Sequence, residues 1–159
     1  IGLETSHQPT LRQLNKQMTT ENFARACEFL RGHGIRIRAF ILLKPLDTSE
    51  EQGIERAIES VRFAFDHGVN CCSVIPTRAG NGIMDRLQHS GRFQPPELRS
   101  LESVINETLG WKRGRVFADL WEAEQFSECP PCATARIERL NTINLSQRAT
   151  SPVVCGHCG

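Results

Sequence analysis

Apolar residues along the first half of the chain follow two alternating periods. Where they recur every third or fourth residue they predict helices, and where they alternate or run together they predict strands. In chain order, the predicted elements are a strand in "IGLET" (1–5), a helix from Thr19 or Thr20 to Arg31, a strand in "RIRAFILL" (36–43), a helix beginning at the T-x-x-E capping box of Thr48 and Glu51, and a strand in "NCCSVIP" (70–76). This alternation, with short glycine-marked connections, predicts βαβ units and a parallel sheet, open or barrel-like.

The strand at 36–43 becomes continuously apolar, which is typical of a strand buried on both faces. Further along, the pattern predicts a helix near 97–109 and a strand in "GRVFADL" (114–120). Beyond about Trp121 the periodicity fades, and cysteine and proline become the dominant signals. We therefore divide the chain into an α/β part, 1–120, and a small appendage, 121–159.

Composition narrows the classes of partner. The 159 residues carry a net charge of +1, so any contact with nucleic acid or an anionic membrane would have to be local. The longest apolar run, 39–43, is too short to cross a bilayer, and we expect no membrane partner. Seven cysteines without a visible secretory leader favour a reducing, cytoplasmic location, where thiols serve as metal ligands or core residues.

Four cysteines form two C-x-x-C pairs, Cys129 with Cys132 and Cys155 with Cys158, separated by 22 residues. Two such pairs can complete a tetrahedral all-sulfur site, and a helix in the intervening "TARIERLNTINLSQ" would shorten the gap. Structural zinc is the leading interpretation. An iron–sulfur cluster is the alternative, because four thiolates suit it equally well. His157 lies inside a knuckle and is interpreted as a bystander.

The remaining cysteines are predicted to pack in the core. Cys27 lies on the apolar face of the first long helix. Cys71 and Cys72 are adjacent in a strand, so they point to opposite faces and cannot chelate one metal together.

Two charged residues each end an apolar strand. Glu4 follows the first strand and Lys44 the second, and in parallel α/β proteins the carboxyl ends of the strands form the ligand site. A carboxylate there can accept hydrogen bonds from a ribose or an amine, and an ammonium can hold a carboxylate or phosphate. Both can equally be solvated charges at the rim of the sheet.

A basic segment, "GWKRGRVF" (110–117), interleaves Lys112, Arg113 and Arg115 with Trp111 and Phe117. It could contact RNA by stacking and phosphate pairing. A basic surface turn is the simpler interpretation.

Several motifs in succession resemble the latter half of radical S-adenosylmethionine (SAM) enzymes. They are "IGLET", "LNKQMT", "RAFILLKP", "NCCSVIPTRAGNGIMDRL" and "GRFQPPELRS", followed by "CPPCATARIERLN" and the last C-x-x-C. The subgroup contains the radical SAM protein of archaeosine biosynthesis, itself similar to the elongator catalytic subunit. The resemblance runs from residue 1 to about 105 and includes the cysteine tail. At Gln94, Glu97 and Arg99 the chain departs from the archaeal members, which affects the substrate assignment most.

The resemblance implies a partial (βα)6 TIM-like barrel whose N-terminal portion binds a [4Fe-4S] cluster through a C-x3-C-x2-C loop. No three cysteines of this chain have that spacing. We therefore expect the C-terminal portion of the barrel, beginning at its fourth strand, with a four-cysteine metal-binding appendage.

The resemblance also implies roles for individual residues. Glu4 and Thr5 would contact the ribose or methionyl part of SAM, and Asn15 with Lys16 would help to hold its carboxylate. Lys44 would face the cavity from the fifth strand. Pro76 and Thr77 would end the sixth strand there.

The function implied is that of a radical SAM enzyme that receives an electron from a donor, generates a 5'-deoxyadenosyl radical and acts on a tRNA nucleoside. This chain alone is expected to be inactive, because the cluster motif is absent. One alternative is a non-catalytic zinc-ribbon module on an α/β scaffold that binds RNA or protein. Another is an ordinary α/β-barrel enzyme of intermediary metabolism.

Overall fold

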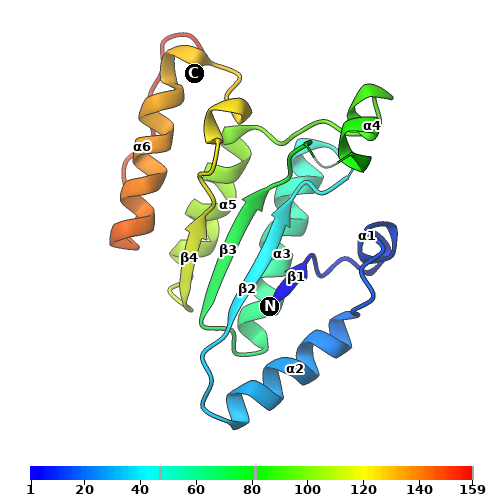
Figure 1. The fold of residues 1–159 in the computed structure, drawn as a ribbon. Helices are drawn as coiled ribbons and strands as arrows, with labels where there is room; N and C mark the ends of the chain where they lie inside the picture. Colours follow the sequence, from blue (N-terminus) through cyan, green and yellow to red (C-terminus); the bar gives the residue numbers. More distant parts are fainter. Residues whose placement is uncertain (47, 81, 159) are drawn as a thin grey trace.

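The centre of the molecule is a four-stranded parallel sheet in the order β1-β2-β3-β4 (Figure 1). The computed structural model describes residues 1–46, 48–80 and 82–158. The strands are β1 (Gly2–Glu4), β2 (Arg38–Leu43), β3 (Cys71–Pro76) and β4 (Arg115–Ala118). The helices are α1 (Gln8–Gln13), α2 (Thr20–Gly32), α3 (Glu50–Asp66), α4 (Ile83–His89), α5 (Leu98–Gly110) and α6 (Pro130–Ser146), with a 3-10 turn η1 (Ala123–Phe126). The predicted parallel α/β sheet is confirmed.

Side-chain caps set where the two long N-terminal helices begin. The Thr19 side chain accepts the backbone N–H of Asn22 at the start of α2. At α3 the cap is Ser49, whose hydroxyl accepts the backbone N–H of Gln52 at 3.2 Å. The predicted capping box of Thr48 is therefore wrong. The Thr48 hydroxyl instead donates to the Leu46 carbonyl, so the helix begins one residue later.

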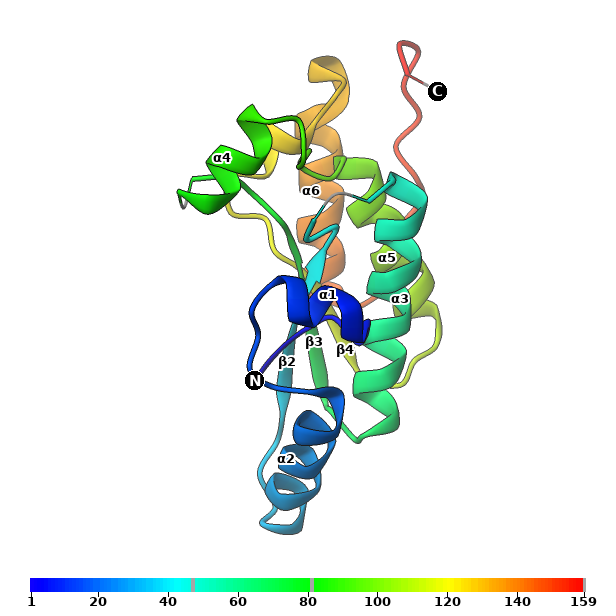
Figure 2. The ribbon, with the colours of Figure 1, turned by 90° about the vertical axis from the view of Figure 1, so that its right-hand side faces the viewer.

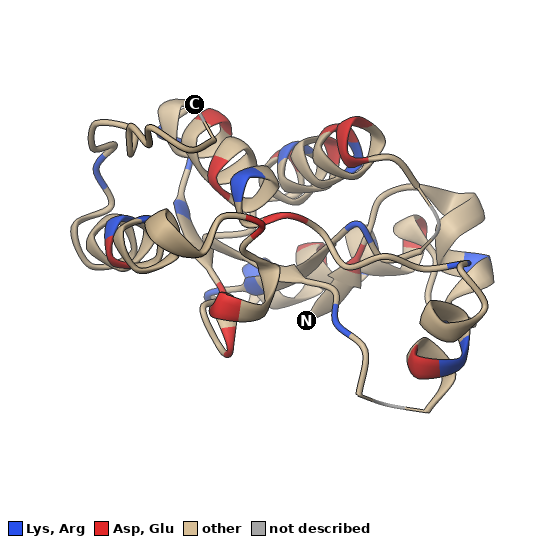
Figure 3. Cartoon of the chain, turned by 90° about the horizontal axis from the view of Figure 1, so that it is seen from above, with Lys and Arg blue, Asp and Glu red and all other residues tan. Residues whose placement is uncertain are grey.

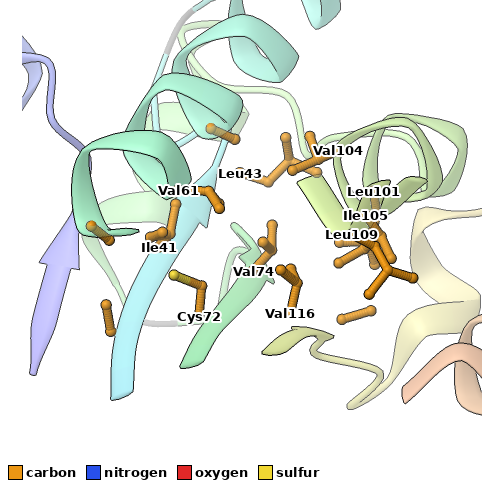
Figure 4. Close-up of a cluster of buried hydrophobic side chains, with 14 of the residues drawn as sticks. Ile41, Leu43, Val61, Cys72, Val74, Leu101, Val104, Ile105, Leu109 and Val116 are labelled. Carbon is orange, nitrogen blue, oxygen red and sulfur yellow. The ribbon is translucent and has the colours of Figure 1, made fainter. Parts of the chain in front are cut away.

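The core lies between one face of the sheet and the pair α3 and α5, which lie side by side over it (Figures 2 and 4). Alternate residues of the strands enter this layer and meet the apolar stripes of the two helices. Those labelled in Figure 4 are Ile41, Leu43, Cys72, Val74 and Val116 from the strands, and Val61, Leu101, Val104, Ile105 and Leu109 from the helices. Each large side chain removed from water contributes roughly 1.5–3 kcal/mol, so this layer dominates the stability of the sheet.

The opposite face of the sheet is open. On β2, Arg38 and Phe40 are exposed while Ala39 and Ile41 are fully buried, so the strand alternates. The prediction of burial on both faces is wrong for this strand, because the crossover helices α3 and α5 both lie on one side. Cys27 and Cys72 are buried as predicted, whereas Cys71 points to the open face and is only half-buried.

Two side chains near the end of α6 cover the outer edge of β4. The Asn144 carboxamide accepts the backbone N–H of Ala118 and donates to its carbonyl, both at 2.9 Å. Gln147 does the same to Val116 at 2.9 and 3.0 Å. These two side chains satisfy the outer edge of β4 as a fifth strand would. The helix predicted between the cysteine pairs is confirmed as α6.

The sheet does not close into a barrel within the described residues, and the barrel stays a prediction. No helix in the described ranges has both the length and the apolar character that crossing a membrane requires.

Candidate metal centre and strand-end site

The four cysteines predicted to bind a metal come together near the C-terminus. Their Sγ atoms all lie within 4.8 Å of one another. Between the two knuckles, Cys129 Sγ lies 3.7 Å from Cys155 Sγ, and Cys132 Sγ lies 3.6 Å from Cys158 Sγ. Such a cluster can hold a metal ion such as zinc, or an iron–sulfur cluster.

The path of the chain explains how the 22-residue gap closes. The 17 residues of α6, which has Cys132 in its first turn, rise about 25 Å away from Cys129. The segment 147–154 then returns beside the helix, and in an extended form it can cover about the same distance. Arg139 fixes this return by donating to the backbone carbonyls of Thr150 and Ser151, both at 2.8 Å.

Backbone geometry makes the four thiols unequal. The backbone N–H groups of His157 and Cys158 lower the pKa of Cys155 to about 6. Partial burial and the three neighbouring cysteines raise the pKa of Cys129 to about 12. The four sulfurs therefore resist simultaneous ionisation on their own, and a bound cation that replaces the thiol protons would remove the conflict.

Buried charges connect the cysteines to the sheet domain. Arg136 donates from Nε to Cys132 Sγ at 3.2 Å, and its Nη2 lies 3.7 Å from Cys158 Sγ. Its Nη1 pairs with Glu102 of α5, which also accepts from Arg139 at 3.0 Å. All three charged side chains are less than a tenth exposed. The sequence analysis missed this network, because nothing in a pattern of isolated charges on two helices shows that they meet.

The carboxyl end of β1 carries the first predicted ligand-binding charge. Glu4 Oε1 accepts from Lys16 Nζ at 2.7 Å, and the two side chains are 20% and 33% exposed. The Glu4 backbone has a φ of +63°, and a hydrogen bond of 2.8 Å from Thr5 N to Leu3 O closes a γ-turn around it. The carboxylate folds back over Gly2, where an added Cβ would lie only 2.4 Å from Oε1. Glycine at position 2 therefore makes room for the pair.

The neighbouring predicted residues organise this turn. Asn15 has a φ of +53° and ends α1, with its N–H bonded to the Arg12 carbonyl and the Lys16 N–H bonded to the Leu11 carbonyl. This ending turns the chain so that Lys16 reaches Glu4. Thr5 is 1% exposed, and its hydroxyl accepts the His7 N–H at 3.1 Å. The roles of these residues in SAM binding stay predictions.

The second predicted charge lies in a different setting. Lys44, with a φ of +52°, pairs through Nζ with Glu50, and its side chain is 6% exposed. The same Glu50 carboxylate accepts the Glu97 N–H at 3.2 Å and the Ser100 hydroxyl. The Lys44 ammonium is thus directed to the starts of α3 and α5. The predicted role of Lys44 as a residue that faces the ligand cavity stays a prediction. Thr77, predicted at the end of the next strand, donates its hydroxyl to the Leu43 carbonyl at 2.8 Å.

A third charged pair at this end was not predicted. Arg78 directly follows Thr77 after β3, and Asp119 directly follows β4; their side chains approach to 3.6 Å. The rule that pointed to Glu4 and Lys44, a charge just after an apolar strand, would have found both.

A hollow of about 580 Å³ opens at the same end, lined by Gln13, Leu46, Ile83, Leu87 and Arg92.

Comparison with known proteins agrees with the archaeosine part of the resemblance read from the motifs, while membership of the radical SAM superfamily stays a prediction. No family model matches the chain. Archaeosine synthase subunit beta of Methanosarcina acetivorans is 31% identical over 112 residues, which are 67% of this chain and 31% of that protein. The subunit of the same name from Thermococcus kodakarensis is 32% identical over 107 residues, 66% of this chain and 33% of that protein. An uncharacterized protein of Methanocaldococcus jannaschii is 28% identical over 109 residues, 67% of this chain and 30% of its own length. The chain thus spans about a third of the length of the curated relatives it matches, and over two thirds of itself it is similar to archaeosine synthase beta subunits.

Proposed function

We propose that this chain forms one wall of the SAM pocket of a radical SAM enzyme that acts on a tRNA nucleoside in archaeosine synthesis. The observation that carries the proposal is the Glu4–Lys16 pair, held in a strained turn at the carboxyl end of β1. Residues in sparsely populated backbone conformations cluster at functional sites. Among the described residues, three of the six non-glycine residues with positive φ are Glu4, Asn15 and Lys44, all proposed site residues. The names of the relatives supply the archaeosine assignment.

The order of the strands supports a barrel. Successive strands are neighbours, all are parallel, and α3 and α5 cover the same face. A barrel wall is built in this way, whereas a doubly wound sheet reverses its strand order and carries helices on both faces. The open face with Phe40 and Leu42 would then line the interior of the barrel.

The residues present fit SAM better than they fit its cluster. The Glu4 carboxylate can accept hydrogen bonds from ribose hydroxyls or an ammonium group, and the Lys16 ammonium can pair with a carboxylate. The chain has no C-x3-C-x2-C, so it offers no site for the cluster that such enzymes use. We assign no step to that cluster here. SAM bound to a reduced cluster would supply the radical, and this chain would hold the ribose and the carboxylate of SAM.

The test uses the complete gene product that contains these 159 residues, reconstituted anaerobically with iron and sulfide. Glu4→Gln should weaken SAM binding roughly ten- to a hundredfold, since a hydrogen bond to a charged group contributes about 1.5–3 kcal/mol. Its cluster absorption should be unchanged. Glu59→Gln, which removes an exposed carboxylate on α3, is the matched control and should bind SAM normally.

Two results would refute the proposal. One is an in-frame upstream coding region without C-x3-C-x2-C, which would leave a non-catalytic zinc-binding module as the better assignment. The other is a failure of the reconstituted product to form 5'-deoxyadenosine from SAM. The isolated chain should not form it under any condition.

For the cysteine centre we propose a single zinc ion with a structural role. Four thiolates about 2.3 Å from one metal stand about 3.8 Å apart, close to the separations of 3.6 and 3.7 Å found here. All four sulfurs lie within 4.8 Å of one another, whereas a multi-iron cluster would hold thiolates on different irons farther apart.

Elemental analysis of the purified chain with its absorption spectrum tests the metal. One colourless equivalent of zinc is expected, lost when Cys129 and Cys158 are both replaced by Ser and retained in Cys71→Ser, which removes a thiol outside the centre. A brown protein with several irons would overturn the zinc assignment, and full metal content in the double variant would overturn the site.

A further inference from the structure

The basic segment noted in the sequence lies at the amino ends of the strands, opposite the site described above. Two adjacent hollows open there. They lie beside the amino ends of β2, β3 and β4, which are at the lower left of the sheet in Figure 1. Lys112, Arg113 and Arg115 line the first hollow, together with Phe117 and the last turn of α6. Arg36, Arg38 and Arg115 line the second, beside Cys71. We call these five cations the basic surface.

The charge of the basic surface is poorly compensated. No carboxylate is among the described residues that line either hollow. Arg113 pairs with Asp66 at 2.8 Å, while the other four cations have no ion-pair partner within residues 1–46, 48–80 and 82–158. The whole chain has a net charge of only +1, so this concentration is local. By contrast, acidic and basic positions are interspersed around the carboxyl end, seen from above in Figure 3.

The basic surface also has an ordered aromatic component. Arg38 lies over the Phe117 ring, 5.1 Å from its centroid, and donates from Nε to Cys71 Sγ at 3.3 Å. These contacts hold the guanidinium at the amino end of β2, at the rim of the sheet. Fixed guanidinium groups at this rim, beside the Phe117 ring, suit a chain of phosphates with attached bases better than a folded acidic protein.

We propose that the basic surface binds the phosphate backbone of an RNA. The proposal rests on the proposed function in one respect, namely that the RNA is the tRNA whose nucleoside reaches the carboxyl end of the sheet. The six residues of β2 span about 20 Å, a distance that a folded RNA exceeds, so one molecule can contact both ends. Phosphate contacts of this kind fix the position of the RNA and read no sequence.

Fluorescence anisotropy with a labelled, unmodified tRNA transcript tests the basic surface in the 159-residue chain. We expect micromolar affinity that falls with salt. Replacing Arg36 and Arg115 together by Gln should raise the dissociation constant at least roughly tenfold and reduce the slope of log Kd against log salt by about 2. The matched control replaces Arg25 and Arg31 by Gln. These two exposed arginines of α2 line a hollow that also contains Glu28 and Asp66, so the same loss of net charge should change little.

The results separate this proposal from the proposed function. Equal affinity and salt slope in the two double variants would overturn the basic surface, as would no binding of tRNA to the wild-type chain, because neither measurement depends on SAM. Normal RNA binding together with unchanged SAM affinity in Glu4→Gln would overturn the SAM role of Glu4 and leave the basic surface standing. Circular dichroism of both variants confirms that they are folded.

Discussion

The pairs Glu4–Lys16 and Lys44–Glu50 occupy equivalent places at the ends of neighbouring strands, yet their surroundings differ. In both, the strand-end residue has a positive φ and its partner comes from the segment that follows the strand. Glu4 lies at the edge of the sheet and its pair is partly exposed. Lys44 lies between β2, α3 and α5 with its side chain 6% exposed, and Glu50 joins three elements. The same sequence signal therefore yields an accessible pair in one place and a structural junction in the other.

The strain at the two positions is offset differently. A non-glycine residue at positive φ costs on the order of 1–3 kcal/mol. At Lys44, packing of its side chain against Gly53 and the pair with Glu50 compensate for that cost. At Glu4 the visible compensation is the backbone hydrogen bond that closes the γ-turn and one partly exposed ion pair, which contributes about 0–1 kcal/mol. The excess strain at Glu4 is what a ligand-binding role would explain.

Removing the carboxylate of the buried junction should have the largest effect. Glu50→Ala leaves the Lys44 ammonium buried without its partner and removes the acceptor of the Ser100 hydroxyl and the Glu97 N–H. We expect a loss of about 3–5 kcal/mol in the free energy of unfolding, measured by urea denaturation. Glu51→Ala, one residue along in the first turn of α3, is the control and should cost much less, because this carboxylate is exposed and acts on the helix dipole alone. Similar losses in the two variants would mean that Glu50 acts only through the helix dipole.

Removing the other partner should cost less. In Lys44→Met the apolar stem remains against α3, and Glu50 keeps the Ser100 and Glu97 donors and some contact with water. We expect a loss of roughly 1–3 kcal/mol in the same assay. A larger loss than in Glu50→Ala would contradict the view that the carboxylate is the centre of the junction.

Short-range patterns predicted the elements well and their surroundings poorly. Periodicity located the strands and long helices, and C-x-x-C spacing located the metal centre, because ligands three residues apart are brought together by local structure. Thr48 and Ser49 are adjacent and both can cap a helix. The sequence could not show which of them caps α3, because that depends on the backbone conformation at each residue.

Contacts between elements far apart in sequence left no comparable signal. Arg136 of α6 meets Glu102 of α5, and the carboxamides of Asn144 and Gln147 pair with the edge of β4. Nothing in the pattern of either segment encodes these meetings. The difference in exposure between Glu4 and Lys44 was missed for the same reason. The residues that bury Lys44 come from α3 and α5, which are distant from it in sequence or follow a loop.

A methyl group at position 2 should disturb only the accessible pair. In Gly2→Ala the new Cβ would lie 2.4 Å from Glu4 Oε1 and 3.1 Å from Lys16 Nζ, so the carboxylate must move. We expect a net loss of up to about 1 kcal/mol, because the ion pair is lost while alanine reduces the freedom of the unfolded chain. In a Glu4→Ser background, where the side chain ends before it reaches residue 2, the same change should be neutral or slightly stabilising. An equal loss in both backgrounds would show that the methyl group clashes with something other than the carboxylate.

The smallest effect expected is the coupling between Glu4 and Lys16 itself. A double-mutant cycle of Glu4→Gln and Lys16→Gln should give about 0.2–1 kcal/mol at low salt, the range of exposed pairs. The coupling should fade as salt is raised, because the screening length falls from about 30 Å at 0.01 M to about 3 Å at 1 M. A cycle of Lys44→Met and Glu50→Gln should keep most of its coupling, since water reaches that pair poorly. Coupling at Glu4 that withstands 1 M salt would make this pair a structural junction like its neighbour, and the strained turn would then need no ligand to account for it.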